Sequence, residues 1–190
     1  MMDYNQVLDK LSQVLSAKRF QHSLGVSQSA AELAIQFGVD VEKAKVTGLL
    51  HDCARGLSSN ILLQMAEAFA IVVNDVEHCQ PVLLHAPLGA HLARKEYGVD
   101  DPQILQAIAL HTTGGRDMAT LAKIVYLADC IEPGREFPGI DRLRSLAFTD
   151  LDAAMLAAFD QSLHYVIELG LLIHPATIEG RNYLLQQQNK

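Results

Sequence analysis

Apolar residues recur every three or four positions along most of this chain, and this spacing is the strongest constraint on its fold. A helix has 3.6 residues per turn, so such a pattern places apolar side chains on one helical face. The alternation that indicates a half-buried strand is scarce, and 70–73 (AIVV) is the only candidate. The clearest helical runs are Val7, Leu8, Leu11, Val14 and Leu15; Ala30, Leu33, Ala34 and Phe37; and Ile104, Ala107, Ile108 and His111.

Residues that typically begin and end helices stand at the edges of these runs. Gly38 and Gly98 each follow an aromatic residue, where a left-handed residue after a helix is often glycine. Asp101-Pro102 has the form of an N-cap followed by proline in the first turn. Asp150 precedes the apolar-faced segment 151–169. We therefore predict an all-α fold of about eight to ten helices, with 71–84 and 132–140 as its long connections.

Length and composition restrict the class of protein. The 190 residues, of which 49% are hydrophobic and none is tryptophan, fit one domain with an aliphatic core. The net charge of −7 disfavours binding to nucleic acid or to an anionic membrane, because both require an excess of Lys and Arg. We find neither a signal peptide nor an apolar run of the roughly 18 residues that spans a membrane. A cytoplasmic protein is expected, and the aliphatic-rich helices are compatible with a homodimer.

The three cysteines give no sign of a disulfide framework or a thiolate metal site. Cys53, Cys79 and Cys130 are far apart in the chain, and no CxxC pair is present. We expect three small buried thiols in a reducing compartment. Cys53 and Cys130 each follow a candidate metal ligand and should face away from it.

Histidine and aspartate residues with ligand chemistry are spread over five predicted helices. In chain order they are His22, the adjacent pair His51-Asp52, His85, His111 and Asp129. Imidazole and carboxylate together suit Fe, Mn, Co, Ni or Zn, whereas calcium prefers oxygen ligands alone. Asp52 and Asp129 each follow an apolar run, where an unpaired carboxylate would be expensive to bury. Metal coordination removes that cost, and a buried ion pair is the competing explanation.

This set of residues is large enough for two metal ions. We expect His22, His51, Asp52 and Asp129 to hold the first ion. His85 and His111 could hold a second, with Asp52 as the bridging ligand. Two ions about 3.5–4 Å apart can clamp a phosphate and activate water. We expect ordinary structural or solvated roles for the remaining histidines, which are His78, His91, His164 and His174.

The pattern His…His-Asp…Asp on helices resembles the HD-domain superfamily of metal-dependent phosphohydrolases. Nearly the whole chain resembles its YqeK-like family, whose members are bacterial symmetrical diadenosine tetraphosphate hydrolases that bind iron. The combination of HTTG with ADxIEPGR is the most specific part of the match. The motifs that carry the resemblance are, in order, RFQHSLGV, TGLLHDCARG, LLHAPLGAHLA, AIALHTTGG, YLADCIEPGREFPGI and LLIHPATIEGRNYLL.

The resemblance implies a role for each matching residue in a single HD domain covering residues 1–190. It implies that His22, His51, Asp52 and Asp129 are metal ligands, and that His85 and His111 complete a second metal position or contact phosphate. The implied substrate-binding residues are Arg19, Arg55, His85, His111, Thr112, Thr113 and Arg135. Arg55 departs from the family pattern, which usually has lysine there, so a planar fork replaces a point charge.

The implied activity is hydrolysis of diadenosine tetraphosphate into two ADP, with one or two iron ions or another divalent metal such as Mn or Co. Asp52, His111 and His85 are the candidate catalytic residues. A local cationic patch of Arg19, Arg55 and Arg135 can hold a small polyphosphate even in an acidic protein. Two alternatives stay open: an HD phosphohydrolase acting on a mononucleotide or a guanosine polyphosphate, and a non-catalytic module that senses nucleotide or metal.

Overall fold

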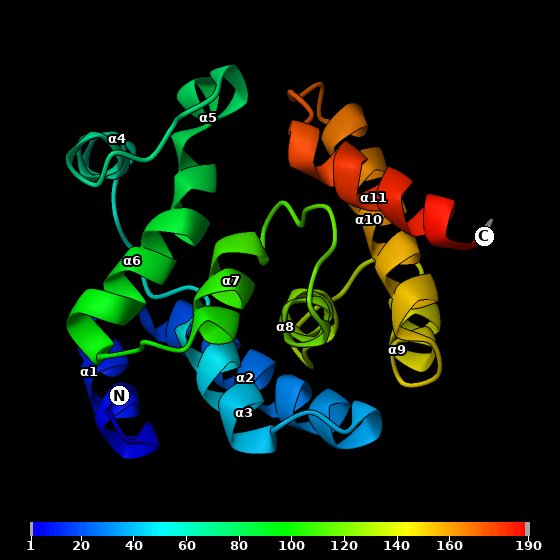
Figure 1. Ribbon diagram of the computed structural model, residues 1–190, viewed down its shortest axis with the longest axis horizontal. Coiled ribbons are helices and arrows are strands. Elements are labelled where there is room, and N and C mark those ends of the chain that lie inside the picture. Colours follow the sequence, from blue (N-terminus) through cyan, green and yellow to red (C-terminus); the bar gives the residue numbers. More distant parts are fainter. Residues whose placement is uncertain (1, 189–190) are drawn as a thin grey trace.

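A computed structural model describes residues 2–188, and all regular structure in that range is helical (Figure 1). The all-α prediction is therefore confirmed. A 3-10 helix, η1 (Pro81–Leu84), precedes α6. The α-helices are α1 (Tyr4–Val14), α2 (Ala17–Phe37), α3 (Val41–Leu50), α4 (Ser59–Ala68), α5 (Asp75–Cys79), α6 (His85–Tyr97), α7 (Pro102–Leu110), α8 (Thr120–Ile131), α9 (Ile140–Ala147), α10 (Leu151–Glu168) and α11 (Pro175–Gln188).

The predicted helix boundaries agree with the local geometry. Gly38 and Gly98 follow α2 and α6 with φ of 66° and 67°, a conformation that glycine adopts without the strain of a side chain. The Asp101 carboxylate accepts a hydrogen bond from the Gln103 amide, and Pro102 is the first residue of α7. The Asp150 carboxylate accepts from two amides in the first turn of α10. These signals act between near neighbours in the chain, so the sequence is sufficient to predict them.

The segment 71–84 is more ordered than expected, which is why the described residues contain eleven α-helices rather than eight to ten. Asn74 and Glu77 form a capping box that begins α5, and η1 follows. Residues 71–73, which are most of the candidate strand 70–73, have no regular structure. Cys79, which we expect to be buried, is exposed at the end of the short helix α5.

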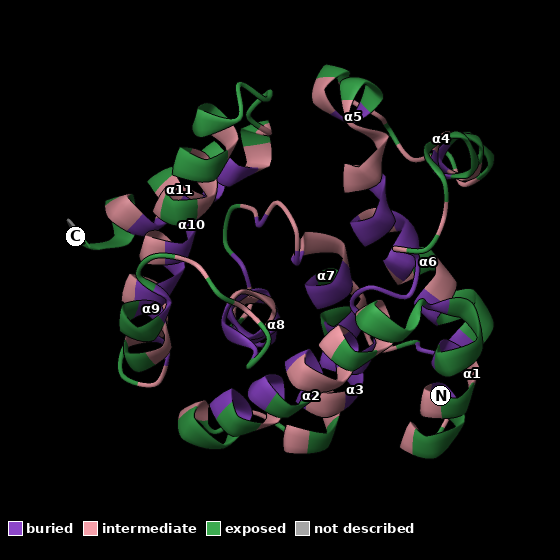
Figure 2. Cartoon of the chain, turned by 180° about the vertical axis from the view of Figure 1, so that it is seen from behind, coloured by how far each residue is buried: buried purple, intermediate pink, exposed green. Residues whose placement is uncertain are grey.

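Helix α8 lies at the centre of the molecule. In Figure 1 it is seen end-on, with α2 and α3 below it, α7 on one side and α9 to α11 on the other; it contacts α2, α3, α7, α9 and α10. Most of its surface is buried, as the purple colour in Figure 2 shows. Asp129 is near the C-terminal end of this helix and is thereby carried into the interior. The buried residues of α8 are Leu121, Ala122, Ile124, Val125, Tyr126, Leu127, Ala128 and Ile131.

Helices α2 and α3 pack closely because Gly48 has no side chain. A Cβ atom at Gly48 would lie 2.9 Å from the Ser27 Cα atom, so any other residue would push the helices apart. The close approach brings His22 on α2 beside His51 at the end of α3, with ring centroids 5.2 Å apart. A glycine that is unremarkable in the sequence thus helps to assemble the site.

A smaller apolar cluster supports the other side of the site. It joins α4 to η1 and α6 and consists of Ala54, Leu62, Ala66, Leu84 and Leu88. Because Leu84 is buried in this cluster, the adjacent His85 has a fixed position at the start of α6. Among the described residues, no helix combines the length and the apolar character needed to cross a membrane.

Candidate functional site

Six side chains converge where α2, α3, α6, α7 and α8 meet. We call them the His/Asp cluster: His22, His51, Asp52, His85, His111 and Asp129. The His22 Nε2 atom lies 3.0 Å from Asp129 Oδ1, and the His85 Nε2 atom lies 3.1 Å from Asp52 Oδ1. Two triplets offer ligand atoms within 4.8 Å of one another, His22 with His51 and Asp129, and His51 with Asp52 and His111. Residues separated by up to 107 positions in the sequence, from His22 to Asp129, are therefore close in space.

Asp52 lies between two pairs of histidines. Its Oδ2 atom is 3.4 Å from His51 Nε2 and 3.8 Å from His22 Nε2. Its Oδ1 atom is 3.1 Å from His85 Nε2 and 3.6 Å from His111 Nε2. The carboxylate is almost completely buried, with 3% of its side chain exposed. Each oxygen thus faces a different pair of imidazoles.

The outer nitrogens of three of these rings bind backbone carbonyls. The Nδ1 atoms of His51, His85 and His111 lie 2.7, 2.5 and 2.7 Å from the carbonyl oxygen three residues earlier. A carbonyl only accepts, so each Nδ1 is the donor, and in the neutral ring Nε2 carries the lone pair. The Nε2 atoms of His85 and His111 are 3.0 Å apart. With both Nδ1 atoms protonated, the two Nε2 lone pairs face the same region, an arrangement that suits a bound metal ion.

This arrangement fits a divalent transition metal ion. Within the described part of the chain, the buried Nε2 atoms of His22 and His51 form no hydrogen bond of normal geometry, although each faces a carboxylate oxygen, that of Asp129 at 3.0 Å and that of Asp52 at 3.4 Å. Buried polar atoms are normally satisfied, and here both belong to a set of nitrogen and carboxylate donors. The residues that would hold a first ion are His22, His51, Asp52 and Asp129.

Electrostatics keep the two carboxylates in the form that binds a metal. Burial raises the pKa of Asp52, but the charge of His51 and hydrogen bonds from the surrounding histidines outweigh it, so the pKa lies far below its usual value. Burial also raises the pKa of Asp129, but the close contact with the His22 ring and the charges of His51 and Arg135 outweigh it and lower this pKa strongly. Both side chains are therefore ionised at neutral pH.

The same carboxylates raise the pKa of two histidines. Burial lowers the pKa of His22 and His51, yet Asp129 and Glu132 at His22, and Asp52 at His51, more than offset this, so both pKa values lie above 6.5. A metal ion must displace a proton from a protonated ring. In the metal-free protein, protonation of these two rings stabilises the fold. This contribution to the free energy of unfolding is complete below the unfolded-state pKa of about 6.5, and it is lost as the pH rises through the raised folded-state pKa values.

We expect metal affinity to fall as pH is lowered, beginning above pH 6.5. The reason is the raised pKa of His22 and His51, each of which releases a proton when it becomes a ligand. For each proton released, the apparent dissociation constant should rise about tenfold per pH unit. Chelator competition at several pH values between about 6 and 8 measures this slope. An affinity independent of pH over that range would contradict the prediction.

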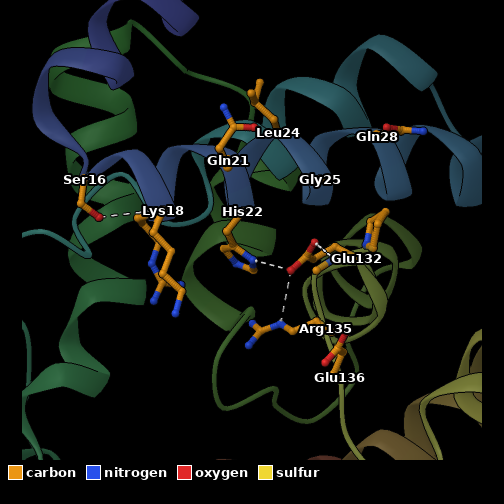
Figure 3. A pocket seen from close by; sticks show the side chains of 13 residues that line it. Ser16, Lys18, Gln21, His22, Leu24, Gly25, Gln28, Glu132, Arg135 and Glu136 are labelled. Atoms are coloured by element: carbon orange, nitrogen blue, oxygen red, sulfur yellow. Dashed lines mark hydrogen bonds and ion pairs between the residues drawn. The ribbon is translucent and has the colours of Figure 1, made fainter.

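Two arginines reach the cluster from a groove of about 930 Å³ between α2 and the α8–α9 connection (Figure 3). The Arg19 Nη1 atom is 2.7 Å from Asp52 Oδ2. The Arg135 guanidinium pairs with the Asp129 carboxylate and donates to the Asp129 carbonyl at 2.8 Å. Lys18 also lines the groove. Two guanidinium groups and an ammonium thus lie at the rim of a buried carboxylate centre, although Glu136 lines the same groove.

The other residues that the resemblance implies lie at different distances from the cluster. The Thr112 hydroxyl is 3.0 Å from His111 Nε2 and 3.2 Å from His85 Nε2, so it is part of the site. The Thr113 side chain donates to the Gly114 carbonyl, and its own carbonyl accepts from Thr177. Arg55 is half-buried, and its amide donates to the Asp52 carbonyl at 2.8 Å, but within residues 2–188 its guanidinium forms no hydrogen bond or ion pair with the His/Asp cluster. Phosphate contacts by Thr113 and Arg55 stay predictions.

The histidines outside the cluster behave as expected, whereas of the three cysteines only Cys53 is buried, Cys130 is half-buried and Cys79 is exposed. His78, His91 and His164 are exposed, and the His91 ring stacks on Phe69 with centroids 5.1 Å apart. The His174 Nε2 atom lies 3.0 Å from the side-chain amide nitrogen of Asn74, and neither residue belongs to the cluster. Burial raises the pKa of the Cys53 and Cys130 thiols to about 12. Both thiols are thus unreactive at neutral pH.

Two residues that we did not select from the sequence support the site. Glu132 is buried and accepts hydrogen bonds from His22 Nδ1 at 3.1 Å and from the Gly134 amide at 2.6 Å. Arg144 on α9 donates to the carbonyls of Ile131, Glu132 and Arg135 at 3.0–3.1 Å. Glu132 is the first residue of the EPGR motif, in which the sequence indicated a role for Arg135 alone.

Replacement of Arg144 by alanine is expected to loosen the 131–135 turn and displace Glu132 and Arg135. The rate of phosphohydrolysis should fall about tenfold to a hundredfold, since displacements of about 1 Å at a site can have such effects. Three carbonyls would lose their donor. Arg142→Ala is the matched control, because Arg142 is exposed on the same helix. Steady-state rates of the two variants measure the effect. Equal rates for both would contradict the prediction.

A protein-family model of the HD domain matches residues 19–134. The chain belongs to the HD-domain family. All six residues of the His/Asp cluster lie inside the matched span. The family assignment and the helical fold both agree with the prediction from sequence.

This HD-domain chain is similar over nearly its full length to two named relatives and to a solved structure. It is 35% identical over 187 residues to a protein of Halalkalibacterium halodurans named bis(5'-nucleosyl)-tetraphosphatase, symmetrical, covering 98% of this chain and 100% of that one. A Bacillus subtilis protein of the same name is 36% identical over 184 residues, with 97% and 98% coverage. A crystal structure from Clostridium acetobutylicum, described as a predicted HD superfamily hydrolase involved in NAD metabolism, superimposes with a TM-score of 0.95 at 43% identity, covering 98% of this chain and 99% of that one.

Proposed function

We propose that this protein is a metal-dependent phosphohydrolase that cleaves diadenosine tetraphosphate symmetrically into two ADP. The observation that carries the proposal is the buried His/Asp cluster with a cationic rim. It lies in a chain that matches symmetrical bis(5'-nucleosyl)-tetraphosphatases from end to end. A buried set of imidazoles and carboxylates suits a metal ion, and the adjacent arginines suit the phosphates of a nucleotide.

The proposal assigns the metal ligands by their positions. His22, His51, Asp52 and Asp129 hold the first ion, and His85 with His111 serve a second ion or the phosphate, with Asp52 between them. Iron is the proposed metal, and manganese and cobalt accept the same donors. A bound divalent ion supplies Lewis acidity toward a phosphoryl oxygen and lowers the pKa of water.

The side chains of this protein bind the substrate, orient the water and stabilise developing charge. Arg19 and Arg135 each present a planar fork that matches two phosphate oxygens. Asp52 orients the attacking water, while His85 and His111 stabilise negative charge on the phosphate and the departing ADP. The water oxygen forms a bond to a central phosphorus, and the bond from that phosphorus to the leaving ADP oxygen breaks. The net reaction consumes one water molecule and gives two ADP.

A product assay tests the proposed function. Protein purified without chelator is incubated with diadenosine tetraphosphate and iron, manganese or cobalt, and nucleotides are separated by chromatography. Two ADP per substrate are expected, and hydrolysis in ¹⁸O-labelled water should place one label on a β-phosphate. AMP plus ATP would contradict symmetric cleavage. Turnover only of mononucleotides or guanosine polyphosphates would favour the second substrate class, and tight ADP binding without turnover would favour a sensor.

We also propose that residues 1–190 act as one HD domain, although the family model covers 19–134. The C-terminal helices contact the site region, since the Thr177 hydroxyl on α11 donates to the Thr113 carbonyl at 2.8 Å. The cytoplasmic location, the homodimer and the lack of nucleic-acid binding stay predictions from sequence. Sedimentation at several protein concentrations tests the homodimer.

A further inference from the structure

Glu132 contacts the ring of His22 from the side opposite the His/Asp cluster. Its Oε1 atom is 3.1 Å from His22 Nδ1, and Figure 3 shows the two side chains facing each other across the groove. Because a carboxylate only accepts, Nδ1 carries a proton toward Glu132. When the ring is neutral, as it must be to bind a metal ion, the lone pair is therefore on Nε2. Nε2 is the atom that lies 3.0 Å from Asp129 Oδ1.

His22 needs this partner because of its place in the chain. His51, His85 and His111 are each the C-cap of a helix, where carbonyl groups can accept from side chains, and each ring binds the carbonyl three residues earlier. His22 lies inside the 21-residue helix α2, where the carbonyls are engaged by amides four residues later. A separate acceptor must therefore come from another element.

We propose that Glu132 is a positioning residue for metal binding, which fixes the orientation and tautomer of His22 so that Nε2 faces the ion. The inference rests on the metal centre of the proposed function. Carboxylates that bind the second nitrogen of a metal-ligating histidine raise its basicity and restrict its rotation. Glu132 itself contacts no substrate in this role.

The surroundings of Glu132 are shaped to hold its carboxylate in this place. A Cβ atom at Gly25 would lie 2.7 Å from Glu132 Oε2, so α2 has room for the carboxylate only because residue 25 is glycine. The Gly134 amide donates to Oε2 at 2.6 Å. Arg144 donates to the Glu132 carbonyl at 3.1 Å. Helix α2, the turn between α8 and α9, and helix α9 itself thus all help to fix the position of the Glu132 side chain.

Glutamine cannot replace Glu132 fully. The carboxylate accepts from two donors, His22 Nδ1–H and the Gly134 amide. A glutamine has one acceptor oxygen and one NH₂ group, so it can satisfy only one of them. If its NH₂ faces His22, Nδ1 must become the acceptor, and the proton moves to Nε2. Glu132→Gln is therefore expected to weaken metal binding less than Glu132→Ala, but measurably.

Zinc affinity, measured by chelator competition on the full chain, tests the inference without reference to activity. We expect Glu132→Ala to weaken zinc binding about tenfold to a hundredfold, as changes in the partners of ligating histidines do. Glu136→Ala is the matched control, because Glu136 lines the same groove but is exposed and contacts no histidine. The control should stay within about twofold of the unmodified protein, well below the change expected at Glu132. Equal affinity of Glu132→Ala and the control would overturn the inference.

Nuclear magnetic resonance of the zinc-loaded protein gives a second readout. The His22 Nδ1–H proton should exchange slowly in the unmodified protein and rapidly in Glu132→Ala. Gly25→Ala retains the carboxylate but displaces it, and alanine favours a helix, so weaker zinc binding by a folded Gly25→Ala protein would show that position matters. This variant also supplies the test if Glu132→Ala does not fold.

The outcomes separate this inference from the proposed function. Zinc binding that depends on Glu132, in a protein that does not cleave diadenosine tetraphosphate, would support the inference and contradict the function. If the unmodified protein cleaves symmetrically, and Glu132→Ala leaves zinc affinity and Nδ1–H exchange unchanged, the proposed function would be supported and the inference contradicted. Failure of the unmodified protein to bind zinc or iron would overturn the inference together with the metal centre.

Discussion

Replacing Asp52 by alanine is expected to abolish both metal binding and hydrolysis. Its two oxygens face four imidazoles at 3.1–3.8 Å, so its removal takes away the only carboxylate between the two histidine pairs in the described structure. Metal ions contribute several kcal/mol to transition-state stabilisation, which corresponds to about a thousandfold or more in rate. Elemental analysis and the rate of ADP formation measure the two losses.

Asp52→Asn extends this experiment, because asparagine retains the shape of the side chain and loses its charge. We expect it to lose most of the activity as well. Asp9→Ala is the control, since Asp9 is exposed on α1 and far from the cluster in the chain. Circular dichroism verifies that the variants are folded. Retention of metal and of more than about a tenth of the rate in Asp52→Ala would contradict the assignment of Asp52 as a ligand.

Replacing Phe159 by alanine is expected to lower the free energy of unfolding more than any other substitution proposed above. Phe159 on α10 is 1% exposed, and its ring centroid is 5.3 Å from that of Tyr126 on α8. A Cβ atom at Gly114 would lie 2.4 Å from the ring, so Phe159 packs directly against the loop that follows His111 and Thr112. Truncating a buried phenylalanine lowers the free energy of unfolding by about 3–5 kcal/mol. For a chain of this size the melting temperature should fall by roughly 6–20 °C.

Phe148→Ala is the matched control for this prediction. Phe148 follows α9 and is half-buried, so its truncation removes fewer contacts and should lower stability less. Thermal unfolding followed by circular dichroism compares the two variants. A loss below about 1 kcal/mol in Phe159→Ala would show that the C-terminal helices contribute little to the core.

The boundaries of the long helices were predictable because the signals are local. A capping aspartate binds amides two or three residues later, and a glycine that ends a helix acts on its own backbone. The five-residue helix α5 escaped prediction, since it is too short to show an apolar period and begins with a capping box of polar residues. The prediction that Cys79 is buried was wrong for a related reason, because a residue's exposure depends on what packs against its helix.

The members of the His/Asp cluster could be selected by their chemistry and by the resemblance, while their common location depends on tertiary packing. Sequence spacing does not reveal that Gly48 lets α2 and α3 approach or that α8 is central. Glu132 and Arg144 were missed because their roles consist of contacts 110 and 9 to 13 residues away in sequence. Neither residue differs in type from many solvated charges in the chain.

The helical class, most helix ends and the donor types available for a metal ion are predictable from the sequence, because these depend on the residue type and its near neighbours. Which nitrogen of each histidine faces the cluster depends on tertiary packing. That choice depends on the acceptor behind the ring: a carbonyl at a helix end for His51, His85 and His111, and the Glu132 carboxylate from a distant turn for His22. A lone pair has a direction, and only packing in three dimensions sets it.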